Sequence, residues 1–235
     1  MPKKTVVITD TRSEEALCAA DYLRAQGYDV QFIPEEISLC DEVRLAEYAK
    51  SLSLTLHAVI HPAPPKRKGG IEEISEDDWI RAREEGPIAA FCVTKAFAGI
   101  FREKGCGSVI YLNSIHAEKP VGKGMLFSTG CGAVQMLMRE ANQDYGEQGV
   151  NFFFIQSGIL EGEEDMRSDV SPVYFGVDMR YPTKRIPAKD HLNGLIAFLL
   201  TDAAGPLTGS DLRADGGMSM YYLRRGRREG VGRNG

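Results

Sequence analysis

The stretch FLLTDAAGPLTGSDLRADGG, residues 198–217, decides the fold. Its first residues close an apolar helical pattern that begins at residue 189, and its end, GSDLRADGG, carries the pattern of a short strand. Glycine and proline lie between the two patterns, where the chain has to turn. The stretch therefore predicts a helix followed by a strand, which is the repeating unit of an α/β protein.

The same alternation continues toward the N-terminus. Residues 16–23, 41–52, 77–104 and 127–147 carry helical spacing, with Pro87 marking a kink or a boundary in the third. Between them, five apolar runs predict strands: KTVVITD (4–10), YDVQFI (28–33), LTLHAVIHP (54–62), GSVIYLNS (107–114) and VNFFFIQSG (150–158). We expect one α/β domain over residues 1–223, a Rossmann-like doubly wound parallel sheet with helices on both faces. We expect a basic, flexible tail over residues 224–235.

Composition and charge narrow the class of protein. A chain of 235 residues with 43% hydrophobic residues and a net charge of −5 fits a globular protein that binds no nucleic acid. The longest apolar run, residues 88–101, is interrupted by Lys95 and is too short for a membrane span. Five cysteines without a CxxC pair favour reduced thiols in a cytoplasmic protein, and neither disulfides nor a metal site.

Over essentially its whole length the chain resembles the short-chain dehydrogenases/reductases. The stretch 198–217 resembles the family's last helix and strand, which end in a TG…DGG pattern. ISEDDW (74–79) resembles the start of the long interface helix, and GSVIYLNS (107–114) resembles the strand that ends at the catalytic serine. Ser157 and Gly158 stand where the family usually has Pro-Gly. The order and spacing of these motifs imply the family's fold.

The turn that binds NAD or NADP in this family is altered here. The family's TGxxxGxG pattern becomes TDTRSEEA at residues 9–16, so that the three glycines are replaced by Asp10, Glu14 and Ala16. Carboxylates at a helix start repel a pyrophosphate. Thr11 and Glu14 also fit a T-x-x-E capping box, which would satisfy the N–H groups of the helix from within. The family's NNAG stretch reads HPAP at residues 61–64. We therefore expect this chain to bind no dinucleotide.

The resemblance also implies a catalytic set, and most of it is missing. The family uses a serine, a tyrosine thirteen residues later, a lysine four residues beyond the tyrosine, and an upstream asparagine. In the family the tyrosine exchanges the proton, while the lysine lowers the pKa of the tyrosine and holds the ribose. Ser114 is retained, but the other three positions hold Phe127, Cys131 and Gly86. Without a titratable group at position 127, no general acid or base stands at the required place, and we expect no catalytic residue in this chain.

Other residues are candidates for catalytic or metal-binding roles at positions that the family does not use. Cys131 in TGCGA resembles a nucleophile elbow, but no strand precedes it, so we expect a buried thiol that fills the lysine's volume. His116, two residues after Ser114, is interpreted as a loop histidine bonded to the backbone. His57 and His61 have zinc-ligand spacing for a helix, but on a strand they would lie about 13 Å apart.

The chain keeps the parts that form subunit interfaces in the family. There, two long helices, here about 77–104 and 127–147, pack against their mates in a neighbouring subunit, and the last helix and strand form the second interface of a tetramer. The resemblance thus implies interface residues Phe97, Phe101, Leu137, Tyr145, Tyr221 and Tyr222. We interpret the chain as a pseudoenzyme subunit that joins an active short-chain dehydrogenase in a heterotetramer, with NAD bound only in that partner.

The C-terminal arginines suggest a substrate class. Arg224, Arg225, Arg227 and Arg228 could bind the phosphates of an anionic substrate such as a CoA thioester, although a solvated tail is the simpler interpretation. The pattern of losses resembles that of a heteromeric family member from anaerobic toluene breakdown, which implies NAD-dependent oxidation of a secondary alcohol on a CoA thioester. Two alternatives stay open: a homo-oligomeric binding or sensor protein that uses the vacated cleft, and an enzyme with relocated residues such as Ser114 and His116.

Overall fold

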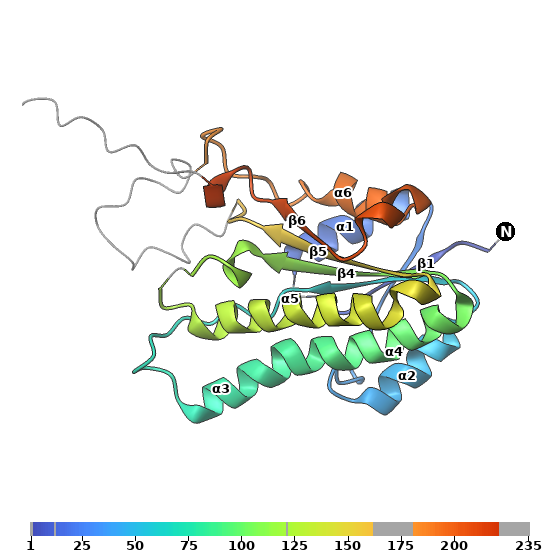
Figure 1. The fold of residues 1–235 in the computed structure, drawn as a ribbon, viewed down its shortest axis with the longest axis horizontal. Helices are drawn as coiled ribbons and strands as arrows, with labels where there is room; N and C mark the ends of the chain where they lie inside the picture. The colour runs from blue at the N-terminus through green and yellow to red at the C-terminus, as the bar shows by residue number, and fades with distance from the viewer. Residues whose placement is uncertain (1, 12, 121, 162–180, 221–235) are drawn as a thin grey trace, which may run out of the picture.

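A computed structural model describes residues 2–11, 13–120, 122–161 and 181–220. Within these ranges, six parallel strands form one sheet in the order β2-β1-β3-β4-β5-β6. The strands are β1 Thr5–Ile8, β2 Asp29–Phe32, β3 Leu56–Pro62, β4 Gly107–Ser114, β5 Val150–Ser157 and β6 Ser210–Ala214. With helices on both faces of this sheet, the predicted single domain of the doubly wound Rossmann-like type is confirmed (Figure 1).

Buried apolar strands hold the centre of the sheet. Every residue of β4 is buried, as expected for a parallel strand that is covered on both faces. Val109 and Tyr111 belong to the core on one face, whereas Ile110 and Leu112 belong to the core on the other. The alternation follows from the two-residue period of a strand. Two apolar cores therefore sandwich the sheet.

Two layers of helices cover these cores. Helices α1 (Glu14–Ala25) and α6 (Asn193–Leu199) lie on one face, and α2 (Glu42–Ser51), α4 (Ala89–Lys104) and α5 (Met125–Tyr145) lie on the other (Figure 1). Leu23 of α1 and Ile196 of α6 are fully buried in one core, and Met138 of α5 is fully buried in the other. Each helix thus turns one apolar stripe toward the sheet.

The long helix predicted over 77–104 is confirmed, with an irregularity at Pro87. Helix α3 (Glu76–Arg83) begins with a capping box between Ser75 and Asp78. It continues through a π-helical turn, η1 (Glu84–Ile88), directly into α4, and Pro87 lies inside η1. Proline has no N–H to donate and its ring displaces the preceding carbonyl groups, so a wider turn accommodates it without ending the helix.

Two residues predicted to contact a second subunit lie in the core instead. Phe97 and Phe101 of α4 have no exposed surface and pack among the buried residues beneath the sheet. A side chain with no accessible surface cannot contact a partner, so the interface prediction is wrong for these two. Leu137 and Tyr145 of α5 are partly buried at the edge of the same core. Tyr221 and Tyr222 lie outside the described residues, as do the arginines of the predicted tail over 224–235.

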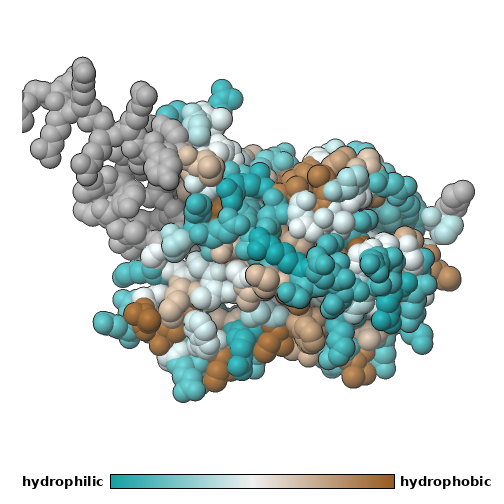
Figure 2. All heavy atoms as spheres, viewed as in Figure 1, coloured by the Kyte–Doolittle hydropathy of each residue, from teal (hydrophilic) through white to brown (hydrophobic). Residues whose placement is uncertain are grey.

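Other apolar side chains on these helices do face outward. Between 37% and 52% of each is exposed, and they lie on α3, α4 and α5: Trp79, Ile80, Phe91 and Met136. Figure 2 shows hydrophobic residues scattered along the edge of the molecule that α3 and α4 form in Figure 1. Within the described ranges, no helix has the length and apolar character to cross a membrane.

Candidate functional site

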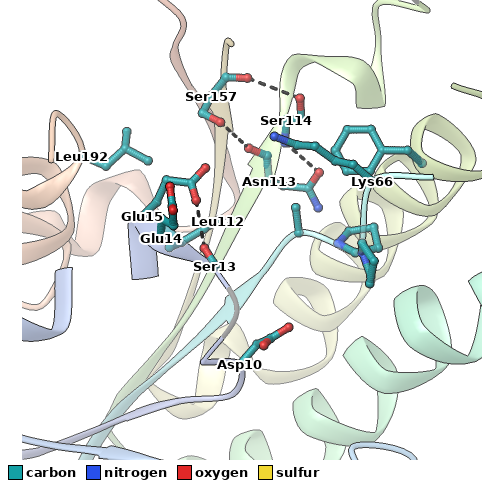
Figure 3. Close-up of a pocket in the computed structure, with 14 residues that line it drawn as sticks. Asp10, Ser13, Glu14, Glu15, Lys66, Leu112, Asn113, Ser114, Ser157 and Leu192 are labelled. Atoms are coloured by element: carbon teal, nitrogen blue, oxygen red, sulfur yellow. Dashed lines mark hydrogen bonds between the residues drawn. The ribbon is translucent and has the colours of Figure 1, made fainter. Parts of the chain in front are cut away.

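A cavity of about 330 Å³ opens at the carboxyl ends of the strands. It is lined from the start of α1, from the turn after β3 and from the ends of β4 and β5 (Figure 3). β2 lies on one side of β1 and β3 on the other, so the strand order reverses at this point. Ligands of doubly wound sheets bind at such a switch point. The cavity brings together four positions singled out from the sequence: Asp10, Glu14, Ser114 and Phe127.

The start of α1 is capped, but not by the predicted residues. Ser13 is the N-cap, and its Oγ accepts a hydrogen bond from the N–H of Ala16 at 3.2 Å. Thr11 precedes the helix, so the predicted Thr11–Glu14 capping box is wrong. Glu14 forms an ion pair with Lys189 instead. Serine is also a strong N-cap residue, and Ser13 stands directly before the first residue of the helix.

This helix start determines whether a pyrophosphate fits. A dinucleotide needs free N–H groups and a close backbone approach here. The Ser13 cap occupies one N–H, and the carboxylates of Asp10, Glu14 and Glu15 line the same end of the cavity (Figure 3). The methyl group of Ala16 is fully buried against the sheet. Since these carboxylates would repel phosphate oxygens in a partly buried site, the residues present do not fit a pyrophosphate.

The turn after β3 fills space beside two helices. A Cβ atom added at Gly86 would lie 3.2 Å from Cβ of Pro64, and one added at Gly130 would lie 3.2 Å from Cγ of Pro64. Pro64 therefore packs between η1 and α5. Gly86 is the position that the resemblance assigns to asparagine, and an asparagine side chain there would have to displace Pro64. The HPAP turn and the glycine at position 86 are thus sterically matched.

Ser114 ends β4 at the wall of the cavity. The residue is 6% exposed, and its hydroxyl donates a hydrogen bond to the carbonyl of Ser157 at 3.4 Å. The N–H of His116 donates to the same Oγ at 3.4 Å, whereas Nδ1 of the His116 ring bonds the carbonyl of Lys119 at 3.0 Å. The predicted backbone partner of His116 is confirmed. Among the described contacts, no side chain acts as a base toward the Ser114 hydroxyl.

Phe127 and Cys131 lie one turn apart on α5. Phe127 is 5% exposed and lines the cavity, while Cys131 has no exposed surface. Burial raises the pKa of the Cys131 thiol, and the nearby ammonium of Lys66 opposes this only in part. A thiol that stays protonated is a poor nucleophile, so the prediction of a buried, space-filling cysteine is supported. Lys66 enters from the turn after β3, with Nζ 6.0 Å from the centre of the Phe127 ring.

The two strand histidines bind different partners. Nε2 of His57 is 2.8 Å from the carbonyl of Leu200, and Nδ1 of His61 is 2.8 Å from Oγ1 of Thr9. Both lie on β3, as predicted. In the described part of the chain, no group of three or more His, Cys, Asp or Glu side chains is placed to hold a metal ion.

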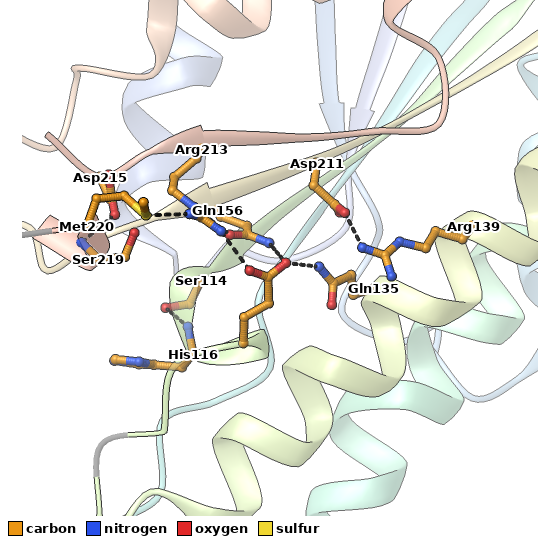
Figure 4. Close-up of polar contacts among 11 residues, drawn as sticks. Ser114, His116, Gln135, Arg139, Gln156, Asp211, Arg213, Asp215, Ser219 and Met220 are labelled. Atoms are coloured by element: carbon orange, nitrogen blue, oxygen red, sulfur yellow. Dashed lines mark hydrogen bonds and ion pairs between the residues drawn. The ribbon is translucent and has the colours of Figure 1, made fainter. Parts of the chain in front are cut away.

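Sequence reasoning missed a polar network behind the cavity. The carboxylate of Glu118 accepts hydrogen bonds from Gln135 and Gln156, both at 2.9 Å, and from Arg213 at 2.6 Å (Figure 4). The hydrogen bonds from Gln156 and Gln135 are the main reason that the pKa of Glu118 is lowered. The network ties the segment after Ser114 to α5, β5 and β6. No sequence signal marks it, because its members lie up to 95 residues apart.

Lys66 and Asn113 are two polar lining residues that the sequence analysis did not place in the cavity. Lys66 belongs to PPKRKGG (64–70), a basic stretch in a loop, and the sequence does not determine which way a loop side chain points. Asn113 precedes the retained serine and is 3% exposed. A polar residue at the end of an otherwise apolar buried strand was the available signal, because such strands deliver their last side chains to the ligand edge of the sheet.

Comparison with known proteins identifies dehydrogenases and reductases that are similar in sequence to this chain. Glucose 1-dehydrogenase 2 of Bacillus subtilis is 23% identical over 63% of this chain and 58% of its own. The 2,5-dichloro-2,5-cyclohexadiene-1,4-diol dehydrogenase LinX of Sphingobium indicum is 27% identical over 92% of this chain and 86% of its own. Acetoacetyl-CoA reductase of Allochromatium vinosum is 22% identical over 92% of this chain and 89% of its own.

Solved structures and a family model agree with these relatives. A gluconate 5-dehydrogenase from Burkholderia cenocepacia, in complex with NADP and tartrate, superposes with a TM-score of 0.82 at 17% identity and covers 94% of this chain and 97% of its own. ElxO with NADP bound gives a TM-score of 0.80 at 16% identity, over 94% and 100%. The family model described as Enoyl-(Acyl carrier protein) reductase matches residues 3–219. The chain therefore belongs to the short-chain dehydrogenase/reductase family of oxidoreductases.

Proposed function

We propose that this chain is the non-catalytic subunit of a hetero-oligomeric dehydrogenase, in which an active short-chain dehydrogenase is the partner. The observation that carries the proposal is the pair Phe127 and Cys131. A benzene ring lines the cavity where the family's tyrosine would exchange a proton, and a fully buried thiol lies one turn behind it. Neither group is a general acid or base near neutral pH, because the first has no ionisable proton and burial raises the pKa of the second.

The start of α1 supports the same proposal. Ser13 caps the helix, and three carboxylates line the end of the cavity where a pyrophosphate would lie. A hydride carrier held in this chain would have to overcome that repulsion. In the proposed complex, NAD binds to the partner, and proton exchange belongs to the partner's tyrosine.

An apolar groove supplies a surface for such a partner. It has a volume of about 260 Å³ and lies between α3 and α5, where Trp79, Pro87 and Leu126 line it. Phe91 on α4 is 48% exposed and Met136 on α5 is 52% exposed. Aromatic residues and methionine are enriched in protein–protein interfaces, which supports a contact surface here. We infer that the corresponding long helices of the partner subunit pack here.

For the substrate, we propose a CoA thioester with a secondary alcohol, which the partner oxidises to a ketone with NAD. The specific candidate is 2-[hydroxy(phenyl)methyl]succinyl-CoA, which would give benzoylsuccinyl-CoA. The support is the resemblance to a heteromeric dehydrogenase of anaerobic toluene breakdown, together with an acetoacetyl-CoA reductase among the relatives. The arginines at 224, 225, 227 and 228 are proposed to bind the CoA phosphates.

Co-expression tests the proposal. The chain would be produced with a related dehydrogenase from the same genome that retains the glycine turn, the tyrosine and the lysine. Native mass spectrometry is expected to show a stable hetero-oligomer, and NADH formation is expected from the complex but not from this chain alone. A homo-oligomer that ignores every such dehydrogenase, or turnover by this chain alone, would overturn the proposal.

Charge substitutions locate the interface. Phe91→Glu and Met136→Glu each place a carboxylate on the proposed contact surface and are expected to weaken assembly at least ten-fold, because a desolvated charge without a partner costs more than about 1.4 kcal/mol. The matched control is Leu54→Glu, since Leu54 is 96% exposed in the turn before β3 and does not line the groove between α3 and α5. Equal effects of all three substitutions on assembly would place the interface elsewhere.

A further inference from the structure

A second cavity, of about 290 Å³, lies at the opposite edge of the sheet, where the strands begin. It is lined by the residues before β1, by the first residues of β3, β4 and β5, by the end of α4 and by the segment after α6. The N-terminus lies at this edge of the sheet (Figure 1). Because doubly wound sheets bind their dinucleotides at the carboxyl edge, this cavity has no part in the family's cofactor site.

Three lysines line the second cavity. Lys3 and Lys4 come from the segment before β1, and Lys104 is the last residue of α4. Lys104 donates a hydrogen bond to the carbonyl of Leu56, whereas neither Lys3 nor Lys4 forms an ion pair within the described part of the chain. Among the described lining residues, Asp202 is the acidic one. Three ammonium groups against one carboxylate leave two positive charges, although the whole chain has a net charge of −5.

His57 shows that the lysine charges meet inside this cavity. It lies at the start of β3, and its Nε2 donates a hydrogen bond to the carbonyl of Leu200 at 2.8 Å. Burial is the main reason that the pKa of His57 is lowered, and the ammonium groups of Lys4 and Lys104 lower it further. The hydrogen bond to Leu200 and the carboxylate of Asp202 act in the opposite direction. An anion placed beside the two lysines would offset their mutual repulsion and their effect on the histidine.

We propose that the second cavity binds the phosphate group of a small phosphate monoester, with Lys3, Lys4 and Lys104 as its cationic contacts. At neutral pH such a group carries a charge of about −1.5 to −2, which matches the two positive charges that the lining residues leave. Leu56 and Leu200 add buried apolar surface for the organic part of the ligand. A volume of about 290 Å³ is close to the lower end of the range for small-molecule sites, so this part is small.

The phosphate site goes beyond the subunit role and does not depend on it. The residues described as lining it are different from those that line the groove between α3 and α5, and from those that line the cavity at the carboxyl edge. Binding is measured on this chain alone. A hetero-oligomer can therefore form although the phosphate site is absent, and the site can bind its ligand although no hetero-oligomer forms.

Calorimetric titration of the purified full chain with glycerol 3-phosphate tests the site, at neutral pH and at low ionic strength, where charges are least screened. Glycerol lacks the phosphate, and glycerate carries a single negative charge. We expect saturable one-to-one binding of glycerol 3-phosphate, at least about ten-fold tighter than that of glycerate, and no binding of glycerol. If glycerol 3-phosphate does not bind, or if glycerate binds as tightly, the proposal is wrong.

A lipid headgroup is a second source of the same phosphate monoester. Vesicles of phosphatidylcholine, with and without phosphatidic acid, separate this source from a soluble ligand in a co-sedimentation assay. We expect glycerol 3-phosphate to bind in the absence of any vesicle, because the cavity holds a ligand of its size. Binding to the phosphatidic acid vesicles without binding of glycerol 3-phosphate would overturn the proposal of a small-molecule site.

Substitutions of opposite sign locate the phosphate. Lys3→Gln together with Lys4→Gln is expected to weaken binding at least about ten-fold, whereas Asp202→Asn removes a carboxylate that repels the ligand and is expected to strengthen it. The matched control is Lys119→Gln together with Lys123→Gln, which removes two exposed cations between β4 and α5, at the carboxyl edge. Thermal unfolding of each variant without ligand separates loss of binding from loss of the fold. Equal weakening by the two double substitutions in folded protein would show an effect of general charge and would refute the assignment.

The pKa of His57, followed by NMR, ties binding to this cavity. The charged groups that act on the ring are Lys4, Lys104 and Asp202, and Tyr28 stacks against it with 6.0 Å between the ring centres. Because a bound anion offsets the two lysines, saturating glycerol 3-phosphate is expected to raise the pKa of His57, and glycerol to leave it unchanged. His57→Gln assigns the signal. An unchanged pKa of His57 in the chain with bound ligand would place the ligand elsewhere and overturn the proposal.

Discussion

At the scale of single residues, Cys131 lies in an environment that does not suit a charged side chain. The Cys131 thiol has no exposed surface, and Val134 and Met138 on the same helix are buried as well. Phe127, one turn earlier, borders the cavity and lies nearly perpendicular to the His116 ring, with 5.9 Å between the two ring centres. The lysine position is therefore closed to water, while the tyrosine position remains at the cavity.

This difference predicts unequal costs for restoring the family's residues. Cys131→Lys would bury an ammonium group without a carboxylate partner, and it is expected to lower the free energy of unfolding by at least about 3 kcal/mol. Phe127→Tyr is expected to cost less than about 1 kcal/mol, because its hydroxyl can reach the cavity. Urea unfolding measures both, with Met136→Lys as the control in the same helix, where the side chain is 52% exposed. A tolerated Cys131→Lys would contradict the closed environment.

Thiol reactivity gives a second residue-level prediction. Because burial raises the pKa of Cys131, its thiolate is scarce at neutral pH and its sulfur is inaccessible. Cys106 is exposed. Alkylation of the native protein with iodoacetamide, followed by mass spectrometry, is expected to label Cys106 and to leave Cys131 unlabelled until the chain unfolds. Equal labelling rates would show that Cys131 is accessible and is a candidate nucleophile after all.

His61 predicts a pH dependence of stability. Its ring is buried against Thr9 and the edge of Tyr111, and burial lowers the pKa of His61 from 6.5 to about 4. Between these two pH values, His61 is therefore mostly protonated in the unfolded chain and mostly neutral in the folded chain. The contribution of His61 to stability is complete above pH 6.5 and is lost as the pH falls toward 4, at up to about 1.4 kcal/mol per pH unit.

The variant His61→Gln isolates this contribution. Its free energy of unfolding in urea, measured alongside that of the unaltered chain, is expected to fall less steeply as the pH drops from 6.5 toward 5. The carboxylates and His57 are common to both proteins, so their titration cancels in the comparison. Parallel curves for the two proteins would show that the pKa of His61 is not lowered by folding.

At the scale of elements, the junction between α4 and β4 depends on one glycine. A Cβ atom added at Gly107 would lie 2.1 Å from the Phe101 ring, which is fully buried beneath the sheet. Gly107→Ala is therefore expected to lower the free energy of unfolding by at least about 2 kcal/mol. Gly99→Ala, in α4 with nothing within 4 Å of the added atom, is expected to stabilise by up to about 1 kcal/mol. Urea unfolding that gives both changes the same sign would contradict this packing.

The types of the elements could be predicted from the sequence better than their contacts. Apolar runs such as VNFFFIQS predict a strand correctly, because a strand buried on both faces needs apolar side chains at every position. The start of α1 was misplaced because Thr11 and Ser13 are both good cap residues, and only the fold selects between them. Phe97 and Phe101 were misassigned because a helix with several apolar stripes does not reveal which one faces the sheet.

The candidate site was predictable in part. Counting residues from Ser114 identified Phe127 and Cys131, because the strand that ends at Ser114 and the helix that carries both residues are close together in the sequence. The steric match of Pro64 with Gly86 and the entry of Lys66 beside Phe127 were not predictable, because both depend on the path of the turn after β3. The hydrogen bonds of Glu118 join segments far apart in the chain and are visible only in the fold.

At the scale of the whole molecule, one architecture carries two separable surfaces. The sheet presents a cavity of mixed charge at its carboxyl edge, and the long helices present exposed apolar side chains on the outside. We propose that this short-chain dehydrogenase/reductase binds no dinucleotide and acts through another subunit. The central claim is therefore that this chain carries the family fold but no dinucleotide site.

Calorimetric titration of the purified chain with NADH and with NADPH tests that claim most directly. The carboxylates of Asp10, Glu14 and Glu15 and the Ser13 cap predict no saturable binding of either dinucleotide up to about millimolar concentration. In the hetero-oligomer, the number of bound dinucleotides is expected to equal the number of partner subunits. Saturable one-to-one binding of NADH or NADPH to this chain alone, with a Kd in the micromolar range, would contradict the account.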